Sequence, residues 1–519
     1  MMLLLFLALI SCTKCQNILI ITLGSGEDRY LAYQSAKILT TTGVNVTLLA
    51  TGDTGPPMPG LEMVIIPSMA EEKGLKHKSE GDIFCLHSEH LLDTASESLQ
   101  LCNMLYYNNF AQTILEKTNY DLAIIALTFS DACILPLMKV MNFPVIGLAT
   151  SFLDLPWVYY NADVPFPLSY VPVMSDIDPE EFTIFEKLRN FRRWRNYLFE
   201  VDNVWRIPAS KIVVDNLKQE FELSQLYDDI GLVLTASDLL MEEPMPLPPH
   251  ILRAGCYYCL APMEFEGVTK EFVENTKSGT VFITTDNPLD DERFVPPKDA
   301  TQVLIDAVVK SGYSVIVTTS DPRLREHRPR PGVLYLRNPS RIDILGHPKT
   351  RLLISCCSFT ETFEALYYGV PIICLPTTAA QKLASKRAAV LGAGEILQWS
   401  QLFQPEAHNV TQRLVTSLIK DKKYREALRH ISTDVRDRPL TPLDVFIYWV
   451  NYAIRHKGHT HLRSETTKKL SLVSYYMIDV VALVALLIFI IFTTLTIFGI
   501  VWVKYYISNA AKLQKKHNE

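Results

Sequence analysis

Residues 18–50 read ILIITLGSGEDRYLAYQSAKILTTTGVNVTLLA, and this stretch decides the fold class of the chain. An apolar run from Ile18 to Leu23 ends in Gly24-Ser25-Gly26, an amphipathic stretch follows from Tyr30 to Thr41, and a second apolar run covers Val44 to Ala50. Apolar runs separated by a segment of helical length are typical of a βαβ unit with parallel strands. We therefore expect an α/β domain that begins close to the start of the chain.

The same alternation returns along the sequence, interrupted once by a Pro-rich segment from Glu242 to Pro249. The pattern predicts strands at 122–126, 145–148, 280–284, 314–318, 333–336, 352–354 and 372–375, with helices at 130–141, 301–310, 359–368, 381–391 and 446–455. Strands that alternate with helices favour a parallel sheet covered on both faces. We expect two tandem Rossmann-like doubly wound domains at 16–240 and 252–440, joined by a linker at 241–251 and followed by a return helix and juxtamembrane segment at 441–479.

Composition excludes several classes of protein. Charged residues make up 20% of the 519 and hydrophobic ones 48%, which is too apolar for a disordered chain and too charged for a polytopic membrane protein. The net charge of −6 gives no sign of a nucleic-acid partner. The body has one dense basic cluster, Arg189, Arg192, Arg193 and Arg195, which we interpret as a solvated helix face.

Both ends of the chain carry apolar segments. Residues 1–15 have the length and composition of a signal peptide, and 480–503 form an apolar stretch long enough to span a bilayer. The tail, 504–519, is basic, so the positive-inside rule places it in the cytosol and the body on the other side. Lys515 and Lys516 resemble a displaced dilysine retrieval signal. These features predict a single-pass type I protein of the endoplasmic reticulum membrane with a lumenal body.

Cysteine and sequon patterns fit that compartment. Cys256 and Cys259 form a C-x-x-C motif without a second pair at zinc spacing, which favours a local disulfide or two ordinary thiols over a redox or metal pair. Asn45 and Asn409 each begin a glycosylation sequon, and Asn409 is the stronger candidate because Asn45 lies in a predicted strand. His456, His459 and His461 are interpreted as part of a polar juxtamembrane linker.

Four motifs carry a resemblance to a known family, and they occur in the same order along the chain as in that family. They are Leu345-Gly346-His347-Pro348-Lys349-Thr350-Arg351-Leu352, Glu364-Ala365-Leu366-Tyr367-Tyr368-Gly369-Val370-Pro371, Arg455-His456-Lys457-Gly458 and Leu168-Ser169-Tyr170-Val171-Pro172. With the membrane anchor, they resemble the UDP-glycosyltransferases of animals, the glucuronosyltransferase family. The resemblance implies a GT-B type fold and the transfer of a hexosyl or glucuronosyl group from a UDP-sugar co-substrate to a small lipophilic acceptor. It implies no separate cofactor.

The resemblance also indicates where a catalytic dyad would lie. The family uses a His as general base and an Asp that orients it, and these positions correspond to Asp28 and Ala126 in this sequence. A carboxylate with a reference pKa of about 3.9 is a weak base for a hydroxyl. Asp131, on the next turn, is the candidate for the missing partner. The alternative interpretation is that Asp28 and Glu27 cap the helix that begins near Tyr30.

The donor positions depart further from the family. Its His-Gly-Gly segment, whose amides approach the diphosphate, corresponds to Cys356-Cys357-Ser358, and a Gly-Ser pair corresponds to Asp286-Asn287. Ser358 and Glu361 have the spacing of a capping box, which predicts a helix start satisfied by its own side chains. The resemblance implies that Glu364 meets the ribose. Among the residues that hold the sugar, Gln381 is retained and Ala380 replaces an Asp.

Two hypotheses follow. The chain is either a working UDP-glycosyltransferase with an unusual site, or a non-catalytic member that binds a lipophile or pairs with active glycosyltransferases as a homo- or hetero-oligomer. A third and weaker hypothesis is metal binding by Cys356, Cys357, Asp286 and Glu361, which have suitable ligand types but no recognised spacing.

Overall fold

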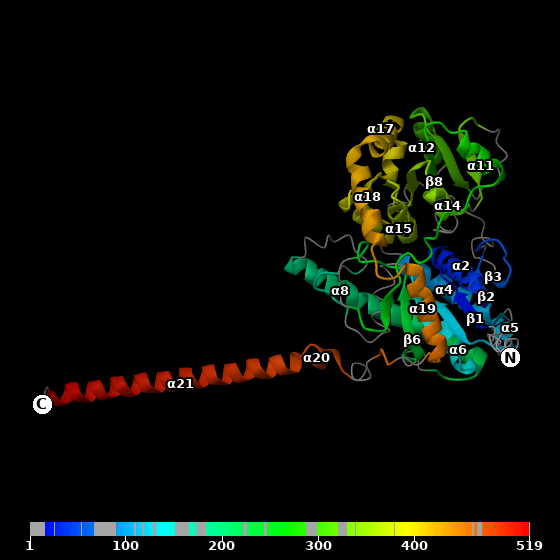
Figure 1. Ribbon diagram of the computed structural model, residues 1–519. Helices are drawn as coiled ribbons and strands as arrows, with labels where there is room; N and C mark the ends of the chain where they lie inside the picture. The colour runs from blue at the N-terminus through cyan, green and yellow to red at the C-terminus, as the bar shows by residue number, and fades with distance from the viewer. Residues whose placement is uncertain are drawn as a thin grey trace, which may run out of the picture. The chain divides into compact units, whose positions relative to one another are not determined.

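A computed structural model of the chain shows two parallel sheets, each between layers of helices, and a long C-terminal helix (Figure 1). It describes residues 16–517, apart from 25, 53, 67–89, 108–109, 117–118, 128–130, 151–165, 172, 174–182, 222–225, 243–246, 287–297, 320–329, 338, 378, 459–460 and 464–469. The expected signal peptide, 1–15, lies outside the described residues.

The first sheet contains seven described strands in the order β3-β2-β1-β4-β5-β6-β7, all paired in parallel. The strands are β1 (Asn17–Thr22), β2 (Asn45–Thr51), β3 (Leu61–Ile66), β4 (Leu122–Ala126), β5 (Val145–Ala149), β6 (Ile230–Thr235) and β7 (Ile251–Arg253). The helices that lie between these strands along the chain are α2 (Gly26–Thr41), α4 (His90–Tyr107), α5 (Phe110–Glu116), α6 (Asp131–Met141), α8 (Ile184–Glu200) and α9 (Ile207–Leu217). A short π-helix, η2 (Val201–Arg206), joins α8 to α9, and a 3-10 turn, η3 (Tyr227–Asp229), precedes β6.

Strand β1 shows why this sheet is covered on both faces. Ile18 and Ile20 belong to the core that includes α2, whereas Leu19 and Ile21 belong to the core that includes α4, α6 and α9. All four side chains are fully buried. Successive side chains of a strand point to opposite faces, so a strand buried on both faces must be continuously apolar. The uninterrupted apolar run in the sequence therefore predicted this layer order.

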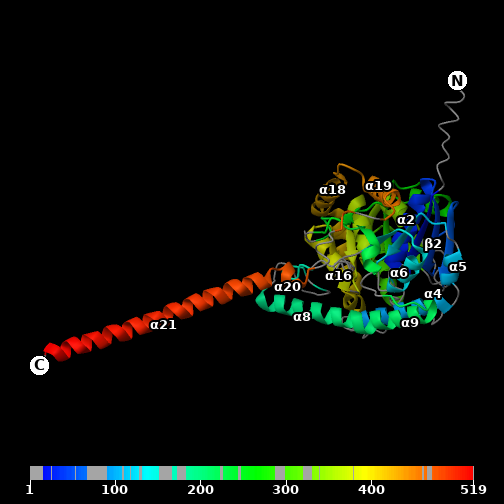
Figure 2. The same ribbon diagram turned by 90° about the horizontal axis from the view of Figure 1, so that it is seen from below.

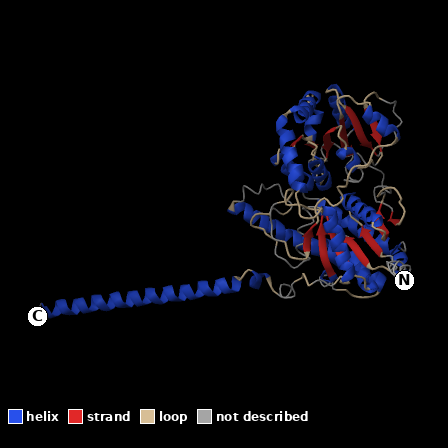
Figure 3. Ribbon diagram, in the orientation of Figure 1, coloured by secondary structure: helices blue, strands red, loops and turns tan. Residues whose placement is uncertain are grey.

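The second sheet contains six described strands in the order β10-β9-β8-β11-β12-β13. Figure 3 shows strands in red and helices in blue. The strands are β8 (Thr280–Asp286), β9 (Ser314–Thr319), β10 (Val333–Leu336), β11 (Thr350–Ser355), β12 (Ile372–Cys374) and β13 (Gly394–Ile396). The helices are α11 (Gly267–Glu274), α12 (Lys298–Lys310), α14 (Arg341–Gly346), α15 (Phe359–Tyr368), α16 (Ala379–Val390), α17 (Ala407–Lys420) and α18 (Lys422–Arg436), with a 3-10 turn η4 (Trp399–Phe403). The predicted doubly wound α/β architecture is confirmed.

The expected linker at 241–251 needs a correction. Strand β7 follows the Pro-rich segment and pairs with β6, so this segment connects two strands of one sheet. The chain leaves the first sheet after Arg253, before α11.

Helix α19 (Pro442–Arg455) is the expected return helix, and it packs against β6 of the first sheet. Its Phe446, Val450 and Ala453 are buried in the core that also contains α2. Tyr257 stacks on Phe446 with ring centroids 4.1 Å apart. The return helix therefore contributes to a core that covers one face of the first sheet and also includes side chains of α15 and α18.

Three disulfides are present among the described cysteines: Cys102–Cys133, Cys256–Cys259 and Cys357–Cys374. The Cys256–Cys259 bond agrees with one of the two readings favoured by the spacing. The other two join residues far apart in sequence, and no spacing rule predicted them. Disulfides are typical of secreted and lumenal proteins.

The C-terminal region forms a separate compact unit. Its helices are α20 (Leu472–Tyr475) and α21 (Ile478–His517), and residues 478–513 of α21 are long and apolar enough to cross a membrane. None of the most apolar window is buried against protein. The candidate span therefore includes the predicted 480–503.

Candidate functional site

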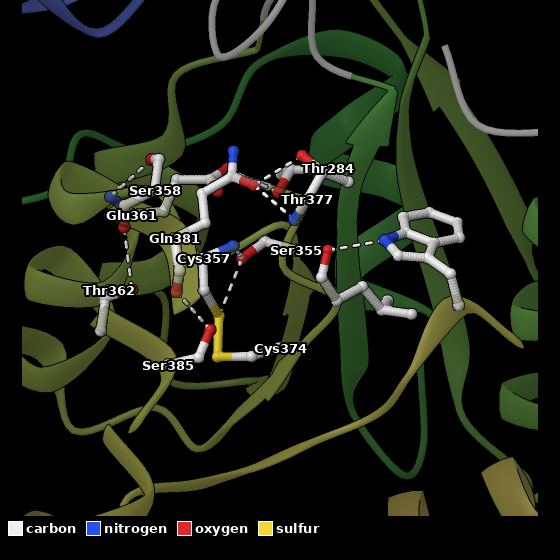
Figure 4. Close-up of a disulfide and its surroundings, with 12 residues drawn as sticks. Thr284, Ser355, Cys357, Ser358, Glu361, Thr362, Cys374, Thr377, Gln381 and Ser385 are labelled. Carbon is white, nitrogen blue, oxygen red and sulfur yellow. Dashed lines mark hydrogen bonds between the residues drawn. A yellow bond between two sulfur atoms is a disulfide. The ribbon is translucent and has the colours of Figure 1, made fainter. Parts of the chain in front are cut away.

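The loop between β11 and α15 contains Cys356, Cys357 and Ser358, to which the resemblance assigns the diphosphate-binding turn. Cys357 has a left-handed backbone conformation with φ of 59°, which glycine adopts readily and other residues seldom do. Its sulfur is bonded to Cys374 at the end of β12 (Figure 4). The Ser355 hydroxyl accepts a hydrogen bond from the Cys357 amide at 2.9 Å. The turn thus keeps a glycine-like conformation while a side chain fills the space that glycine would leave open.

The predicted capping box at the start of α15 is only half formed. The Ser358 hydroxyl accepts from the Glu361 amide at 3.4 Å, as expected of an N-cap residue. The Glu361 carboxylate does not reach back to the cap. It is fully buried, accepts a hydrogen bond from the Thr284 hydroxyl at 2.6 Å, and lies 3.6 Å from the Arg341 guanidinium. Glu361 therefore does not complete the predicted capping box, and its carboxylate is bound by Thr284 and Arg341 instead.

A different carboxyl group meets this helix start. Glu27, in the first turn of α2, accepts hydrogen bonds from the Thr360 amide at 2.8 Å and from the Thr360 hydroxyl at 3.1 Å. The first amides of a helix have no partner within the helix and attract anions. Glu27 therefore satisfies, from the first domain, a donor at the start of the helix that follows the Cys356-Cys357-Ser358 turn. Burial raises the pKa of Glu27 above its ordinary value, opposed by these hydrogen bonds.

Arg341 connects this contact to Glu364. Its guanidinium donates to the Thr360 hydroxyl at 2.9 Å and forms an ion pair with Glu364 at 3.1 Å between Nε and Oε2. It also lies over the Tyr30 ring, 4.0 Å from the centroid. Burial raises the pKa of Glu364, and the charge of Arg341 opposes that rise. Glu364, expected to hold a ribose, is fully buried and is bound by an arginine of its own chain.

The remaining donor-site candidate with a described position is Gln381, near the start of α16. Its side-chain oxygen accepts hydrogen bonds from the amide and the hydroxyl of Thr377, both at 2.8 Å (Figure 4). Asn287 lies outside the described residues. Asp286 ends strand β8, where its backbone pairs with Thr319. Of the predicted donor residues, the structure brings Cys356, Cys357, Ser358 and Glu364 together on one loop and helix.

The two catalytic candidates have separate hydrogen-bond partners. Asp28 is buried and accepts from the Thr150 hydroxyl at 2.6 Å, just after β5. Asp131 is fully buried at the start of α6 and accepts from the Tyr227 hydroxyl. Burial, together with the Asp131 charge, raises the pKa of Tyr227 well above its ordinary value.

The alternative that Asp28 and Glu27 merely cap a helix near Tyr30 also needs correction. Helix α2 begins at Gly26, so both acids lie in its first turn. Acidic side chains in that turn interact favourably with the helix dipole. Their oxygens, however, accept from Thr150 and Thr360, on other elements.

The metal hypothesis is contradicted. Cys357 forms a disulfide, so its sulfur is not free to act as a thiolate ligand. Within the described part of the chain, no group of three or more His, Cys, Asp or Glu side chains is arranged to hold a metal ion. Cys356 remains a buried thiol.

Sequence reasoning missed Arg341 as a member of this site. Ser340 caps α14 through a hydrogen bond from the Asp343 amide, and this local signal predicts a helix start at Arg341. It does not predict that the guanidinium is buried with carboxylates of α15. That arrangement depends on the packing of α14 against α15.

The fold is that of a GT-B glycosyltransferase. The solved structure of the glycosyltransferase VinC in complex with DTDP matches with a TM-score of 0.53 and 13% identity, covering 85% of this chain and 100% of that one. The glycotransferase of kitacinnamycin matches with a TM-score of 0.50 and 12% identity, covering 84% of this chain and 99% of that one. At such low identity, this likeness concerns the fold alone.

The chain belongs to the UDP-glucoronosyl and UDP-glucosyl transferase family, whose model matches residues 66–516. It is 27% identical over 389 residues to human UDP-glucuronosyltransferase 1A8, covering 73% of this chain and 69% of that protein. It is also 27% identical over 379 residues to the UDP-glycosyltransferase UGT5 of Dactylopius coccus, covering 70% of this chain and 67% of that protein. The family expected from the sequence motifs is confirmed.

Proposed function

We propose that this chain is a non-catalytic member of its family that keeps the two-domain scaffold but does not take a UDP-sugar. One observation carries the proposal: Glu27 accepts from both the amide and the hydroxyl of Thr360 at the start of α15. A diphosphate at this helix start would have to displace a group that is already hydrogen-bonded there. The helix N-terminus is therefore not available as an anion site in this arrangement.

The neighbouring side chains oppose replacement of Glu27 by an anion. A ligand phosphate that displaced it would approach Glu361 and Glu364, which are both fully buried. Repulsion between close like charges is of the order of several kcal/mol at intermediate dielectric. Arg341 is the nearby cation, and it is already engaged by Glu364 and the Tyr30 ring. These polar groups of the site are thus already paired with side chains of the chain itself, and Arg341 is not left to bind a diphosphate.

A scaffold of this kind would act by binding a small lipophile or by pairing with active glycosyltransferases. The proposed setting is the lumenal side of the endoplasmic reticulum membrane, with a cytosolic tail after the span. Three disulfides and the exposed Asn409 on α17 support a lumenal body. The basic residues after the span support the type I orientation.

The rival hypothesis is a transferase in which Asp28 acts as the base, and its hydrogen bond from the Thr150 hydroxyl is the observation in its favour. Release of UDP from UDP-sugars distinguishes the two. We expect native membranes that contain the full chain to release UDP no faster than membranes that contain the Asp28→Asn variant. The non-catalytic proposal would be overturned if the wild-type chain released UDP and the Asp28→Asn variant did not.

A further inference from the structure

Helix α8 has an inner face that is firmly held by the first domain. Asn190 is fully buried, and its side chain accepts from one backbone amide and donates to two carbonyls within residues 168–173, at 2.8 to 2.9 Å. Trp194 stacks between Phe166 and Tyr197, with centroid distances of 5.2 and 5.7 Å. The orientation of the helix about its axis is therefore fixed, and so is the identity of the face that it turns outward.

The outward face of α8 is apolar. Ile184, Phe185, Leu188, Phe191 and Phe199 are between 55% and 80% exposed. Ile184, Leu188 and Phe191 are spaced by four and three residues, so they form a stripe along one side of the helix. Figure 2 shows α8 and α9 running along one side of the first domain, with the first turns of α8 at the free end. We refer to these five side chains as the α8 stripe.

Basic side chains accompany the α8 stripe. The helix contains five cations and two acids in a chain whose net charge is −6; the cations are Lys187, Arg189, Arg192, Arg193 and Arg195, and the acids are Glu186 and Glu200. Interpretation of the arginines as a solvated face explains the charges but not the large apolar side chains beside them. An exposed apolar stripe with basic residues next to it is characteristic of helices that lie in a membrane interface.

The chain also carries its own candidate membrane span, close in sequence to the first domain. Arg463 is held on the first domain by an ion pair with Asp228 at 3.1 Å and a hydrogen bond to the Ile230 carbonyl at 3.2 Å. Only residues 464–477 separate it from the candidate span that begins at Ile478. At roughly 3.5 Å per residue, this connection cannot exceed about 50 Å, so a bilayer crossed by α21 is always within reach of the body.

We propose that α8 is an interfacial helix, with the α8 stripe inserted among lipid headgroups of the bilayer that α21 crosses and its arginines on lipid phosphates. Long arginine stems can cover apolar surface while the guanidinium reaches the phosphates. A second copy of the chain is the less suitable occupant, because two stripes packed together would also bring their cations close to each other. The lipid surface matches both the apolar and the charged parts of the face.

The test uses the full chain, reconstituted with its body outside vesicles of phosphatidylcholine, with or without about one-fifth phosphatidylserine. A site for a specific protease replaces residues 464–469, so that cleavage removes the covalent tether after folding. The body is then separated by flotation into vesicle-bound and free fractions. We compare wild type with the Phe185→Ser, Leu188→Ser, Phe191→Ser triple variant. The matched control is Met263→Ser, Val268→Ser, Val390→Ser, whose side chains are 60% to 75% exposed on other elements.

We expect the wild-type and control bodies to stay with the vesicles, and the bound-to-free ratio of the α8 variant to fall at least tenfold. Replacement of Arg189 and Arg192 by Gln should weaken retention mainly on vesicles that contain phosphatidylserine. Free wild-type body after cleavage would overturn the proposal, as would equal retention of the α8 variant and the control. Retention that disappears at low protein density, with α8-to-α8 cross-links, would identify a second copy as the partner and also overturn it.

Discussion

Removal of the Glu27 side chain should expose the start of α15 to water. In the Glu27→Ala variant, the Thr360 amide and hydroxyl lose the oxygen that accepts from them at 2.8 and 3.1 Å. Each hydrogen bond contributes about 0.5–1.5 kcal/mol net, so the two together contribute about 2 kcal/mol. We count no additional charge effect, because burial raises the pKa of Glu27 and so disfavours its ionised form.

Amide hydrogen exchange at Thr360 gives a local measure of this loss. The first amides of a helix have no intrahelical acceptor, so we expect Thr360 to owe much of its protection to Glu27. A loss of about 2 kcal/mol corresponds to exchange about 30-fold faster at that amide. Mass spectrometry with single-residue resolution can measure it in the full chain in detergent.

Two variants serve as controls for this exchange measurement. Glu27→Gln keeps an acceptor oxygen and should stay within about fivefold of wild type at Thr360. Glu186→Ala removes the capping carboxylate of α8 and should accelerate exchange near Thr183 only. Unchanged exchange at Thr360 in Glu27→Ala would refute the account of how this helix start is satisfied.

Three further predictions concern pH, packing and topology. Burial raises the pKa of Glu27 and of Glu364, so the stability linked to their protonation is fully present below about pH 4.3 and is lost as pH rises through their native pKa values. The Tm of the wild-type chain, measured from pH 4 to 8, should therefore fall relative to the Tm of a Glu27→Gln, Glu364→Gln variant. A Cβ on Gly231 would collide with the Gly458 carbonyl, so Gly231→Ala should destabilise the protein by about 1–3 kcal/mol in thermal unfolding and loosen the end of α19. Protease added to sealed microsomes should remove only the residues after about Val503, with a glycan on Asn409; digestion of the body would contradict the orientation.

The strand pattern of both sheets could be predicted because it depends on local sequence. Val333–Leu336 and Leu122–Ala126 form strands with the predicted bounds, and β8 extends the predicted 280–284 by only two residues. Strands β3, β6, β7 and β13 were missed. Both β7 and β13 are three residues long, which is too short for a periodicity to be recognised.

The contacts of the candidate site could be predicted only in part. The spacing of Ser358 and Glu361 correctly predicted the cap by Ser358, because that bond is local. The bond from Glu27 to Thr360 joins residues that are 333 positions apart, and the Cys357–Cys374 bond depends on the neighbouring positions of β11 and β12. Contacts of this kind follow from tertiary packing, for which a single sequence carries no local signal.

Binding of UDP to the full chain tests the central claim most directly, since it requires no knowledge of an acceptor. We expect isothermal titration calorimetry to show no saturable heat up to millimolar UDP, which corresponds to less than about 4 kcal/mol of binding free energy. A variant that combines Glu27→Ala, Ser358→Gly and Glu361→Gly should gain measurable binding, because it frees the start of α15 and removes two carboxyl groups. A micromolar Kd in the wild-type chain would contradict the claim that the protein fills this site with its own side chains.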